Sequence, residues 1–403
     1  MKQTEIGLIP DDWEVKRLGE IGEPCMCKRI LKEQTSPTGD IPFYKIGTFG
    51  GIPDAYISRE LFEQYKEQYN YPKKGTLLLS AAGTIGRVVV FDGKDSYFQD
   101  SNIVWIDNDE TKVTNDFLFY CYSRMQWKTE EGGIVSRLYN ANLKSTSFIA
   151  PKSLAEQQRI AKALSDVDAL ISTTEKLIQK KMNIKQGAMQ NLLTGKKRLP
   201  GFGPQTKSPA YKQTELGPVP DDWEVKNLGE LFDMKAGGDV DKEHFSYCKS
   251  SLYKYKIFSN GLENEGIYGY TDLPKYKGNA ITITGRGTVG IAMFREEDFD
   301  AVIRLLVLNS KNDNLTNNSY ITEEINSCIS FPNESTGVPQ LTVPQIRDIV
   351  IALPSKEEQT AIANVLSSMD KEIETLNTKL EKYRNLKTAM MQQLLTGKIR
   401  LVK

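Results

Sequence analysis

The sequence predicts an α+β fold with two globular mixed α/β domains, separated by a pair of long antiparallel coiled-coil helices and related by a pseudo-twofold internal repeat. Three observations predict it: a duplicated sequence, apolar residues spaced as in long paired helices, and short apolar runs bounded by turn residues. The chain has 403 residues, which is too long for one small core and fits at least two domains.

The duplication shows at both ends of each half. KQTEIGLIPDDWEVKRLGE begins at Lys2 and KQTELGPVPDDWEVKNLGE begins at Lys212, and only four of these 19 positions differ. LAEQQRIAKALSDVD at Leu154 corresponds to KEEQTAIANVLSSMD at Lys356, and the later QNLLTGKKRL corresponds to QQLLTGKIRL. A repeat this long is a whole domain with its helix rather than a solenoid unit. Each half therefore has a preserved start, a divergent middle and a preserved end.

Two long helices are predicted by apolar residues that recur in alternating steps of four and three, the period of a coiled-coil seam. Each helix should run about 40 residues, or about 60 Å. We expect the two helices to pair with each other; a generic amphipathic helix against its own domain is the alternative. The predicted seam comprises Ile160, Leu164, Val167, Ile171, Ile178 and Leu192 in the first copy, and Ile362, Leu366, Met369, Ile373, Leu376, Leu380, Tyr383, Met390 and Leu394 in the second.

The helix ends carry their own signals. Each start fits a capping box, in which a serine and a glutamate satisfy each other's free backbone N–H groups: Ser153 with Glu156, and Ser355 with Glu358. Gly195 and Gly397 follow the last apolar residues, where a left-handed residue ends a helix. Apolar residues off the seam suggest a second buried face against another subunit: Leu170, Leu177, Met189, Leu193 and Leu395.

These signals divide the chain into five segments. We expect a first domain at residues 1–152, a long helix at 153–195, a linker rich in Gly, Pro and Lys at 196–212, a second domain at 213–354, and a second long helix with its tail at 355–403. In the divergent middles, strands should flank AAGTIG in the first domain and GRGTVG in the second. The segment DFLFYCYSRM at 116–125 fits either a helix or a strand.

Composition excludes several functional classes. The 52 basic and 52 acidic residues cancel, which argues mildly against a non-specific nucleic-acid coat. No apolar run is long enough to span a membrane and the polar start is no secretory signal, so we expect a cytoplasmic protein. The five cysteines form no disulfide or zinc pattern. With a single histidine and no GxxxxGKS or GxxxxGKT loop, no catalytic or metal-binding residue is predicted, and the chain resembles a binder.

Two motifs suggest enzymes but fit poorly. The glycines of GRGTVG spell a dinucleotide fingerprint, yet an apolar β-like run follows them where a helix is required, so a tight β-turn is the better interpretation. PDDWEVK, at Pro10 and again at Pro220, contains elements of a metal-dependent nuclease. Its carboxylates lie within seven residues and do not come from separate strands, so we expect a turn in which Trp13 or Trp223 packs as an anchor.

Four motifs, present twice and in the same order, carry a family resemblance. IPDDWEVKRLGEI, the GTIG or GTVG turn, a proline followed by E-Q-x-x-I-A, and the LLTGK helix end resemble specificity subunits of type I restriction–modification enzymes. The resemblance covers essentially the whole chain. It implies two target recognition domains, each binding one half of a bipartite, gapped DNA sequence, with the helix pair setting the gap and docking methyltransferase subunits.

The resemblance also implies partners and cofactors. Expected partners are double-stranded DNA, two methyltransferase (modification) subunits and restriction/translocase subunits. S-adenosylmethionine, ATP and Mg²⁺ are expected on those subunits and none in this chain. The half-sites should lie about one helical turn apart, roughly 10 bp between centres. A non-enzymatic coiled-coil scaffold with two protein-binding modules is the alternative function.

Candidate DNA contacts lie in the divergent middles, because side chains at groove edges read the sequence while phosphate contacts mainly position the protein. Arginine pairs with guanine, and asparagine or glutamine with adenine. The candidates are Lys28, Arg29, Lys32, Tyr44, Lys45, Arg87, Arg137 and Asn140 in the first domain, and Lys235, Lys256, Ser259, Asn260, Arg286 and Arg304 in the second.

Overall fold

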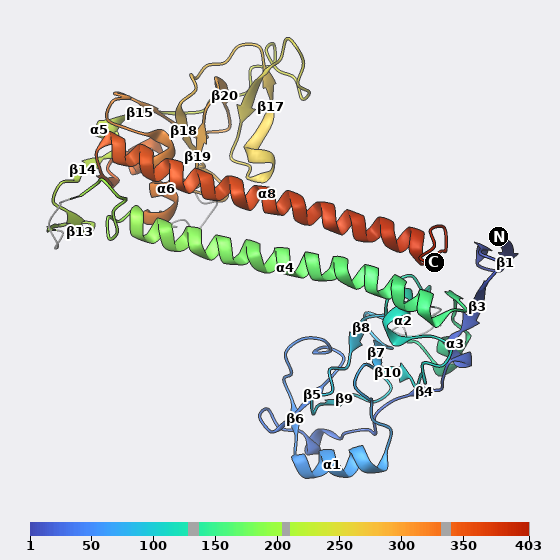
Figure 1. Ribbon diagram of the computed structural model, residues 1–403. Coiled ribbons are helices and arrows are strands. Elements are labelled where there is room, and N and C mark those ends of the chain that lie inside the picture. The colour runs from blue at the N-terminus through green and yellow to red at the C-terminus, as the bar shows by residue number, and fades with distance from the viewer. Residues whose placement is uncertain (128–136, 204–209, 332–339, 403) are drawn as a thin grey trace. The chain divides into compact units, whose positions relative to one another are not determined.

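The computed structural model describes residues 1–127, 137–203, 210–331 and 340–402; residues 204–209 of the expected linker lie outside this description. The chain forms two compact units. Unit 1 comprises Met1–Glu175 with Lys379–Lys403, and unit 2 comprises Lys176–Thr378. Each unit therefore contains a globular part together with one end of each long helix, α4 (Leu154–Leu192) and α8 (Lys356–Leu394) (Figure 1).

The described globular part of unit 1 contains short strands, three α-helices and two 3₁₀ turns, the second of which is η2 (Lys32–Gln34). Its strands are β1 (Lys2–Thr4), β2 (Gly7–Ile9), β3 (Trp13–Arg17), β4 (Pro24–Cys25), β5 (Ile41–Tyr44), β6 (Tyr56–Ile57), β7 (Leu77–Ser80), β8 (Val88–Val90), β9 (Tyr97–Phe98), β10 (Ile103–Ile106) and β11 (Ser147–Pro151). Its α-helices before α4 are α1 (Arg59–Gln68), α2 (Asn115–Tyr122) and α3 (Asn140–Ser145), and a 3₁₀ turn, η1 (Leu18–Glu20), follows β3.

Unit 2 has a closely similar order of elements. Its strands are β12 (Tyr211–Thr214), β13 (Gly217–Pro220), β14 (Glu224–Asn227), β15 (Phe232–Ala236), β16 (Tyr255–Phe258), β17 (Ile267–Thr271), β18 (Ala280–Ile283), β19 (Ala292–Arg295), β20 (Phe299–Ala301), β21 (Leu306–Ser310) and β22 (Val350–Leu353). Its α-helices before α8 are α5 (Leu228–Leu231), α6 (Asn318–Cys328) and α7 (Val343–Arg347), and a 3₁₀ segment, η3 (Glu263–Gly266), precedes β17.

The two units share one sheet topology despite their divergent middles. A four-stranded sheet has the order β4-β10-β7-β8 in unit 1 and β15-β21-β18-β19 in unit 2, and a three-stranded sheet has the orders β6-β5-β9 and β17-β16-β20. In both units the three-stranded sheet contains one parallel pair, β5 with β9 and β16 with β20. The predicted mixed α/β domains and their internal repeat are therefore confirmed, and the undecided segment at 116–125 lies largely in helix α2.

Helices α4 and α8 pack together and run antiparallel in each unit. In unit 2, Lys185 Nζ lies 2.7 Å from Asp370 Oδ2 and Lys181 Nζ lies 2.7 Å from Glu372 Oε1. In unit 1, Arg384 pairs with Glu175 and Lys387 with Asp168. The lysines at seam positions therefore meet carboxylates of the opposite helix. All the predicted seam residues are buried or half-buried.

Of the five residues predicted to form a second buried face against another subunit, three pack within this chain and two are exposed. Met189 packs partly against the core of unit 2. Leu193 is buried in the core of unit 2 and Leu395 in that of unit 1, because the chain turns back onto its own globular part after each helix. Leu170 and Leu177 remain exposed on α4, by 45% and 39%.

The duplicated ends of the sequence meet in a clasp within each unit. In unit 1, the Arg400 guanidinium, downstream of α8, donates to both oxygens of Glu156 at 2.6 and 2.7 Å and to both oxygens of Asp12 at 2.8 and 2.6 Å. It lies 5.7 Å from the centre of the Trp13 ring. The hydrogen bond from Arg400 lowers the pKa of Asp12 below its ordinary value.

Unit 2 repeats the clasp with Arg198, which follows α4 and binds Glu358 and Asp222 against Trp223. The PDDW motif thus binds the arginine that follows a long helix through its second aspartate and its tryptophan, rather than forming part of a nuclease site. Gly195 and Gly397 have φ values of 67° and 70°, as predicted for helix ends. The capping box forms only in part: Ser153 and Ser355 accept backbone N–H groups, but the two glutamates bind arginine instead, because a bidentate ion pair is the stronger interaction.

The glutamine of each E-Q-x-x-I-A motif links the start of the long helix to the globular part. Gln157 is fully buried, accepts from the N–H of Thr114 before α2 at 2.9 Å and donates to Pro151 O at 2.9 Å. Gln359 makes the equivalent bonds to Asn317 N at 2.7 Å and Pro354 O at 2.9 Å. The repeated motifs therefore build one frame twice, around different middles.

Candidate nucleic-acid interface

A glycine turn follows the central strand of the larger sheet in each unit: Ser80–Gly86 in unit 1 and Thr284–Gly290 in unit 2. A hydroxyl stabilises each turn from inside. Ser80 Oγ donates to Thr84 O at 2.6 Å and accepts from Arg87 N at 2.9 Å, and Thr284 Oγ1 does the same with Thr288 O and Ile291 N. The predicted tight turn between two strands is confirmed.

An aromatic side chain covers the last glycine of each turn. A Cβ on Gly86 would lie 2.5 Å from Trp127 Nε1, and one on Gly290 would lie 2.2 Å from Phe331 Cδ2. Both glycines also have φ near +88°, at +89° and +87°, so close approach and backbone conformation each require glycine. The last residue of each turn is therefore restricted to glycine, and the turn is packed against an aromatic ring.

In unit 1 two further loops pack beside the glycine turn. The first loop is Tyr44–Phe49, and its Phe49 O accepts a hydrogen bond from Arg87 Nη1 at 2.7 Å. The second loop is Gln99–Asn102, called the left-handed loop because Ser101 has a φ of 54°. Its Gln99 N donates a hydrogen bond to Tyr44 O at 2.9 Å. Ala81 N of the turn donates to Asn102 O at 2.7 Å. Arg137 forms an isolated antiparallel β-bridge with Ala82, so it lies beside the same loops.

Unit 2 places the equivalent loops together. The first loop is Phe258–Gly261, and Phe258 O accepts from Val302 N at 2.9 Å. The left-handed loop is Val302–Leu305, in which Ile303 and Arg304 have φ values of 57° and 60°. Such values are strained for non-glycine residues, above all for a β-branched one. Arg286 forms an isolated antiparallel β-bridge with Gln340, as Ala82 does with Arg137 in unit 1.

The loop cluster of each unit comprises its first loop, its glycine turn, its left-handed loop and the bridging residue Arg137 or Gln340. Eight of the 14 predicted DNA-binding residues lie in or directly beside these clusters: Tyr44, Lys45, Arg87 and Arg137 in unit 1, and Ser259, Asn260, Arg286 and Arg304 in unit 2. The other six lie on other elements: Lys28, Arg29 and Lys32 between β4 and β5, Asn140 at the start of α3, Lys235 on β15 and Lys256 on β16.

Several of these side chains have partners within their own unit. Lys45 Nζ lies 2.8 Å from Asp54 Oδ1, and Lys28 Nζ lies over the Tyr69 ring at 4.9 Å. Lys256 lines a hollow of about 250 Å³ together with four acidic residues: Glu265, Glu296, Glu297 and Asp298. Arg304 is exposed and Arg286 half-buried. The two arginines of unit 2 are thus the cationic side chains best placed on its cluster.

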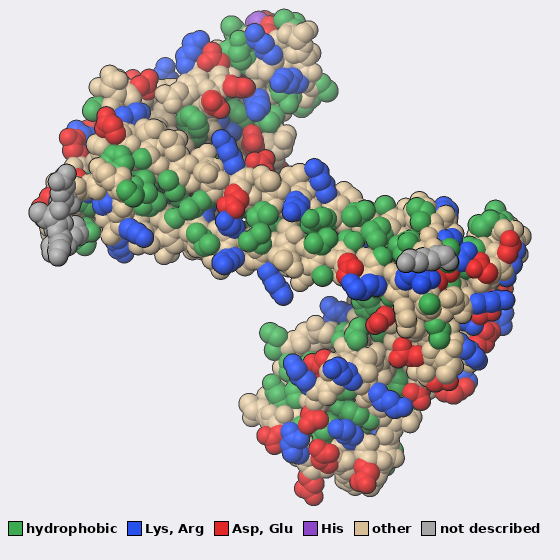
Figure 2. Space-filling view, viewed as in Figure 1, with side chains coloured by type: hydrophobic (Ala, Val, Ile, Leu, Met, Phe, Trp, Pro, Cys, Tyr) green, Lys and Arg blue, Asp and Glu red, His purple; other side chains and the backbone are tan. Residues whose placement is uncertain are grey.

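The clusters also contain residues outside the predicted set, namely Gln99, Ser101, Asn102, Ile303 and Gln340. Their left-handed backbone and loop pairing follow from contacts distant in sequence. The glycine turn is the local sequence pattern that predicts structure near them. On the face shown in Figure 2, Lys and Arg side chains are interspersed with Asp and Glu.

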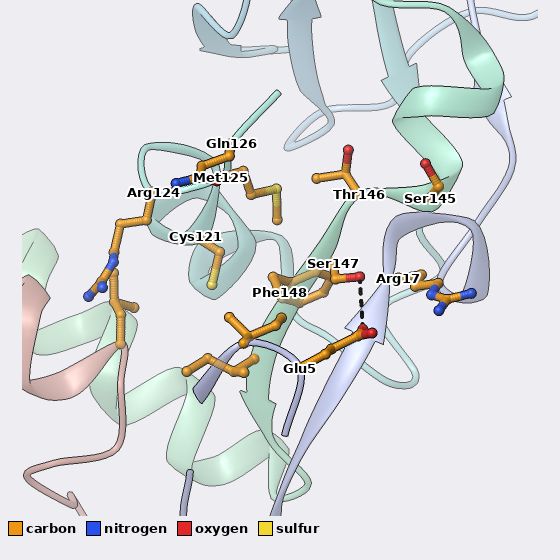
Figure 3. Close-up of a pocket in the computed structure, with 13 residues that line it drawn as sticks. Glu5, Arg17, Cys121, Arg124, Met125, Gln126, Ser145, Thr146, Ser147 and Phe148 are labelled. Atoms are coloured by element: carbon orange, nitrogen blue, oxygen red, sulfur yellow. Dashed lines mark hydrogen bonds between the residues drawn. The ribbon is translucent and has the colours of Figure 1, made fainter. Parts of the chain in front are cut away.

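A separate hollow of about 790 Å³ lies in the frame of unit 1 (Figure 3). Arg17 and Arg124 stand on opposite sides of it, and Ser147 Oγ lies 3.5 Å from Glu5 Oε1. Cys121 lines the hollow, but burial raises the pKa of its thiol, so it stays protonated and is a poor nucleophile. Among the described residues, no group of three His, Cys, Asp or Glu side chains could hold a metal ion.

Comparisons with known proteins bear on both units. Residues 10–181 and 220–382 each match the family described as the type I restriction modification DNA specificity domain. A type I restriction enzyme specificity subunit of Haemophilus influenzae is 59% identical over 160 residues, which are 40% of this chain and 41% of that relative. The MjaX specificity subunit of Methanocaldococcus jannaschii is 28% identical over 421 residues, covering 99% of this chain and 96% of the relative.

A solved structure shows the same fold. The S subunit of a type I restriction–modification system from M. genitalium matches with a TM-score of 0.63 at 15% identity, over 98% of each chain. No helix among the described residues combines the length and apolar character needed to cross a membrane.

Proposed function

We propose how this chain recognises DNA from the premise that it belongs to the type I restriction–modification DNA specificity family and is a non-catalytic specificity subunit. Each unit binds one half of a bipartite, gapped DNA site through its loop cluster. Within a cluster, exposed side chains such as Arg304 contact base edges, and lysines and tyrosines contact phosphates.

The observation that carries this proposal is the contrast between frame and cluster. The clasp, the buried glutamine and the glycine turn recur in both units with the same bonds. The cluster side chains differ at equivalent positions. Lys45 and Ser259 each follow the residue whose carbonyl oxygen accepts a hydrogen bond from a backbone N–H of the left-handed loop. Ser101 and Arg304 occupy equivalent positions within the two left-handed loops. A shared frame with different contact residues suits two unlike half-sites.

We further propose that the helix pair sets the gap and docks two methyltransferase subunits. Leu170, Leu177 and Ile184 recur every seven residues on α4 and are 45%, 39% and 45% exposed, which supports an apolar contact with a partner helix. Figure 2 shows hydrophobic side chains along the visible face of the helix pair. Those partners would supply S-adenosylmethionine chemistry at adenine, and restriction/translocase subunits with ATP and Mg²⁺ would complete the complex.

The repeated hairpins also support a partner that binds twice. Gln3, Glu5 and Ile6 recur as Gln213, Glu215 and Leu216 in the second hairpin, and Ile6 and Leu216 are both 46% exposed. Folding alone does not require the same or similar exposed side chains at both sites. Two copies of one subunit, each contacting the frame of one unit, would require them.

The test is genome-wide adenine-methylation mapping in cells that carry the chain with its methyltransferase subunit and no other adenine methyltransferase. A single asymmetric motif with two specified halves and a fixed gap supports the proposal. If the chain were a protein scaffold, no such motif would appear. The complex would then also lack the steep loss of DNA affinity with added salt that phosphate contacts produce.

A further inference from the structure

Asn260 uses both ends of its side-chain amide inside the loop cluster of unit 2. Its Oδ1 accepts from Gly285 N of the glycine turn at 2.7 Å, and its Nδ2 donates to Ile303 O of the left-handed loop at 2.6 Å. The side chain is half-buried. A base edge would have to compete with both bonds, so direct recognition of adenine by this amide is disfavoured.

Unit 1 makes the same connection without a side chain. There Ala81 N, which is equivalent to Gly285 N, donates directly to Asn102 O of the left-handed loop at 2.7 Å. In unit 2 the amide of Asn260 stands between the turn and the loop. The residue at the equivalent position of unit 1, Ile46, instead donates its backbone N–H to Gln99 Oε1 at 2.9 Å.

We propose that Asn260 is a positioning residue that holds the glycine turn and the left-handed loop of unit 2 in register, so that Arg286 and Arg304 reach DNA together. Arg286 follows Gly285, and Arg304 follows Ile303, so each arginine is next to a residue that Asn260 binds. The backbones approach closely here, since a Cβ on Gly285 would lie 2.9 Å from Arg304 O. This role rests on the proposed function, in which the cluster contacts bases.

The experiment compares methylation motifs of Asn260→Ala, Arg286→Ala, Arg304→Ala and the double variant Asn260→Ala/Arg304→Ala, each co-expressed with the methyltransferase subunit. The probe is the host genome, and the readout is the methylated fraction at the wild-type motif and at every single-base variant of it. Asn314→Ala, an exposed asparagine in another loop of unit 2, is the control for a lost amide. Melting temperatures of the purified complexes show whether a variant folds.

The positioning role predicts that Asn260→Ala relaxes the second half-site at every base pair that depends on Arg286 or Arg304, about tenfold or more in relative methylation. The first half-site keeps its specificity. Because Asn260 acts through the arginines, the double variant should be no more relaxed at the base pair that depends on Arg304 than Arg304→Ala alone. Non-additivity of this kind is what interacting residues show.

Other outcomes overturn the inference in distinguishable ways. Relaxation at one base pair only, with the arginine-dependent pairs intact, would make Asn260 a direct base contact. Equal loss of methylation at all sites with a lower melting temperature would make its role merely structural. If Arg286→Ala and Arg304→Ala leave the motif unchanged, the proposed function of the cluster fails, and the positioning role fails with it.

Discussion

Single residues in the divergent middles are adapted to their own unit, as Glu324 illustrates. This carboxyl is 2% exposed, its Oε1 accepts from Ala352 N at 2.9 Å, and its Oε2 has no partner among the described residues. Burial raises the pKa of Glu324 well above its ordinary value of 4.5. In unit 1, Cys121 occupies the equivalent place, seven residues after the helix cap. The position therefore favours a neutral side chain.

Replacing Glu324 with glutamine should raise the stability of unit 2 at alkaline pH. With a raised pKa in the folded state, the folded protein holds a proton that the unfolded chain loses above about pH 4.5, so the free energy of unfolding falls as the pH rises. Glu324→Gln removes this loss. Melting temperatures at pH 5 and pH 8 should diverge for the wild type and stay closer together for the variant. A variant that melts lower than the wild type at pH 8 would contradict this, and Glu357→Gln, at an exposed glutamate, is the control.

Residue chemistry could be predicted only where the relevant pattern is local. The sequence marked Asn260 because amides recognise adenine, but both amide ends bind backbone from loops 25 and 43 residues away. No local pattern encodes such contacts. Residue type alone predicts Arg286 and Arg304 as DNA contacts, and they lie on the same cluster because the sheet topology brings their loops together.

At the scale of elements, the helix ends and the start of each domain are held by the clasp. Arg400 joins Asp12 and Glu156 across 388 and 244 residues, and Glu156 is 1% exposed. The motif was visible in the sequence because it is written twice. The contact between Arg400 and Glu156 could not be predicted, because the nearby Ser153 favours a capping box with the same glutamate.

Loss of the clasp should destabilise the unit that contains it. Arg400→Ala leaves the buried Glu156 without a partner, which costs about 3 kcal/mol for a buried ion pair. Arg198→Ala should have the same effect on unit 2. The measurement is chemical unfolding of the purified chain, with Lys398→Ala, an exposed lysine of the same tail, as the control. Equal unfolding midpoints for Arg400→Ala and Lys398→Ala would show that the clasp contributes nothing.

The clasp should also be sensitive to acid. Because the hydrogen bond from Arg400 lowers the pKa of Asp12 in the folded state, its stabilisation is present above the ordinary carboxyl range and is lost as the pH falls below about 4. The same applies to Asp222 beside Arg198. A plot of melting temperature against pH should therefore fall less steeply between pH 5 and pH 3 in Asp12→Asn than in the wild type. Identical slopes would refute this linkage.

The long helices were the most predictable elements. Their apolar period is regular, and the lysines that interrupt it, such as Lys185, meet carboxylates of the opposite helix. The loops were the least predictable, because short strands give weak periodicity and the left-handed residues Ile303 and Arg304 have no sequence signal. The frame could thus be anticipated from repetition, while the arrangement of the cluster required coordinates.

At the scale of the whole molecule, the chain consists of one frame built twice around two different middles. The matched topology of the units makes the middles interchangeable in principle, since both are inserted between the same pair of strands: β3 and β11 in unit 1, and β14 and β22 in unit 2. Under the proposed function, this arrangement would let one scaffold serve DNA sites with unrelated halves.

Methylation mapping of a chimaera tests the central claim most directly. Residues 18–146 of unit 1 are replaced by residues 228–349 of unit 2, so that both frames carry the same middle. The mapped adenine-methylation motif should become an inverted repeat of the half-site assigned to unit 2, with the gap of the wild type. A chimaera that folds with its methyltransferase subunit and still methylates the original asymmetric motif would contradict the account.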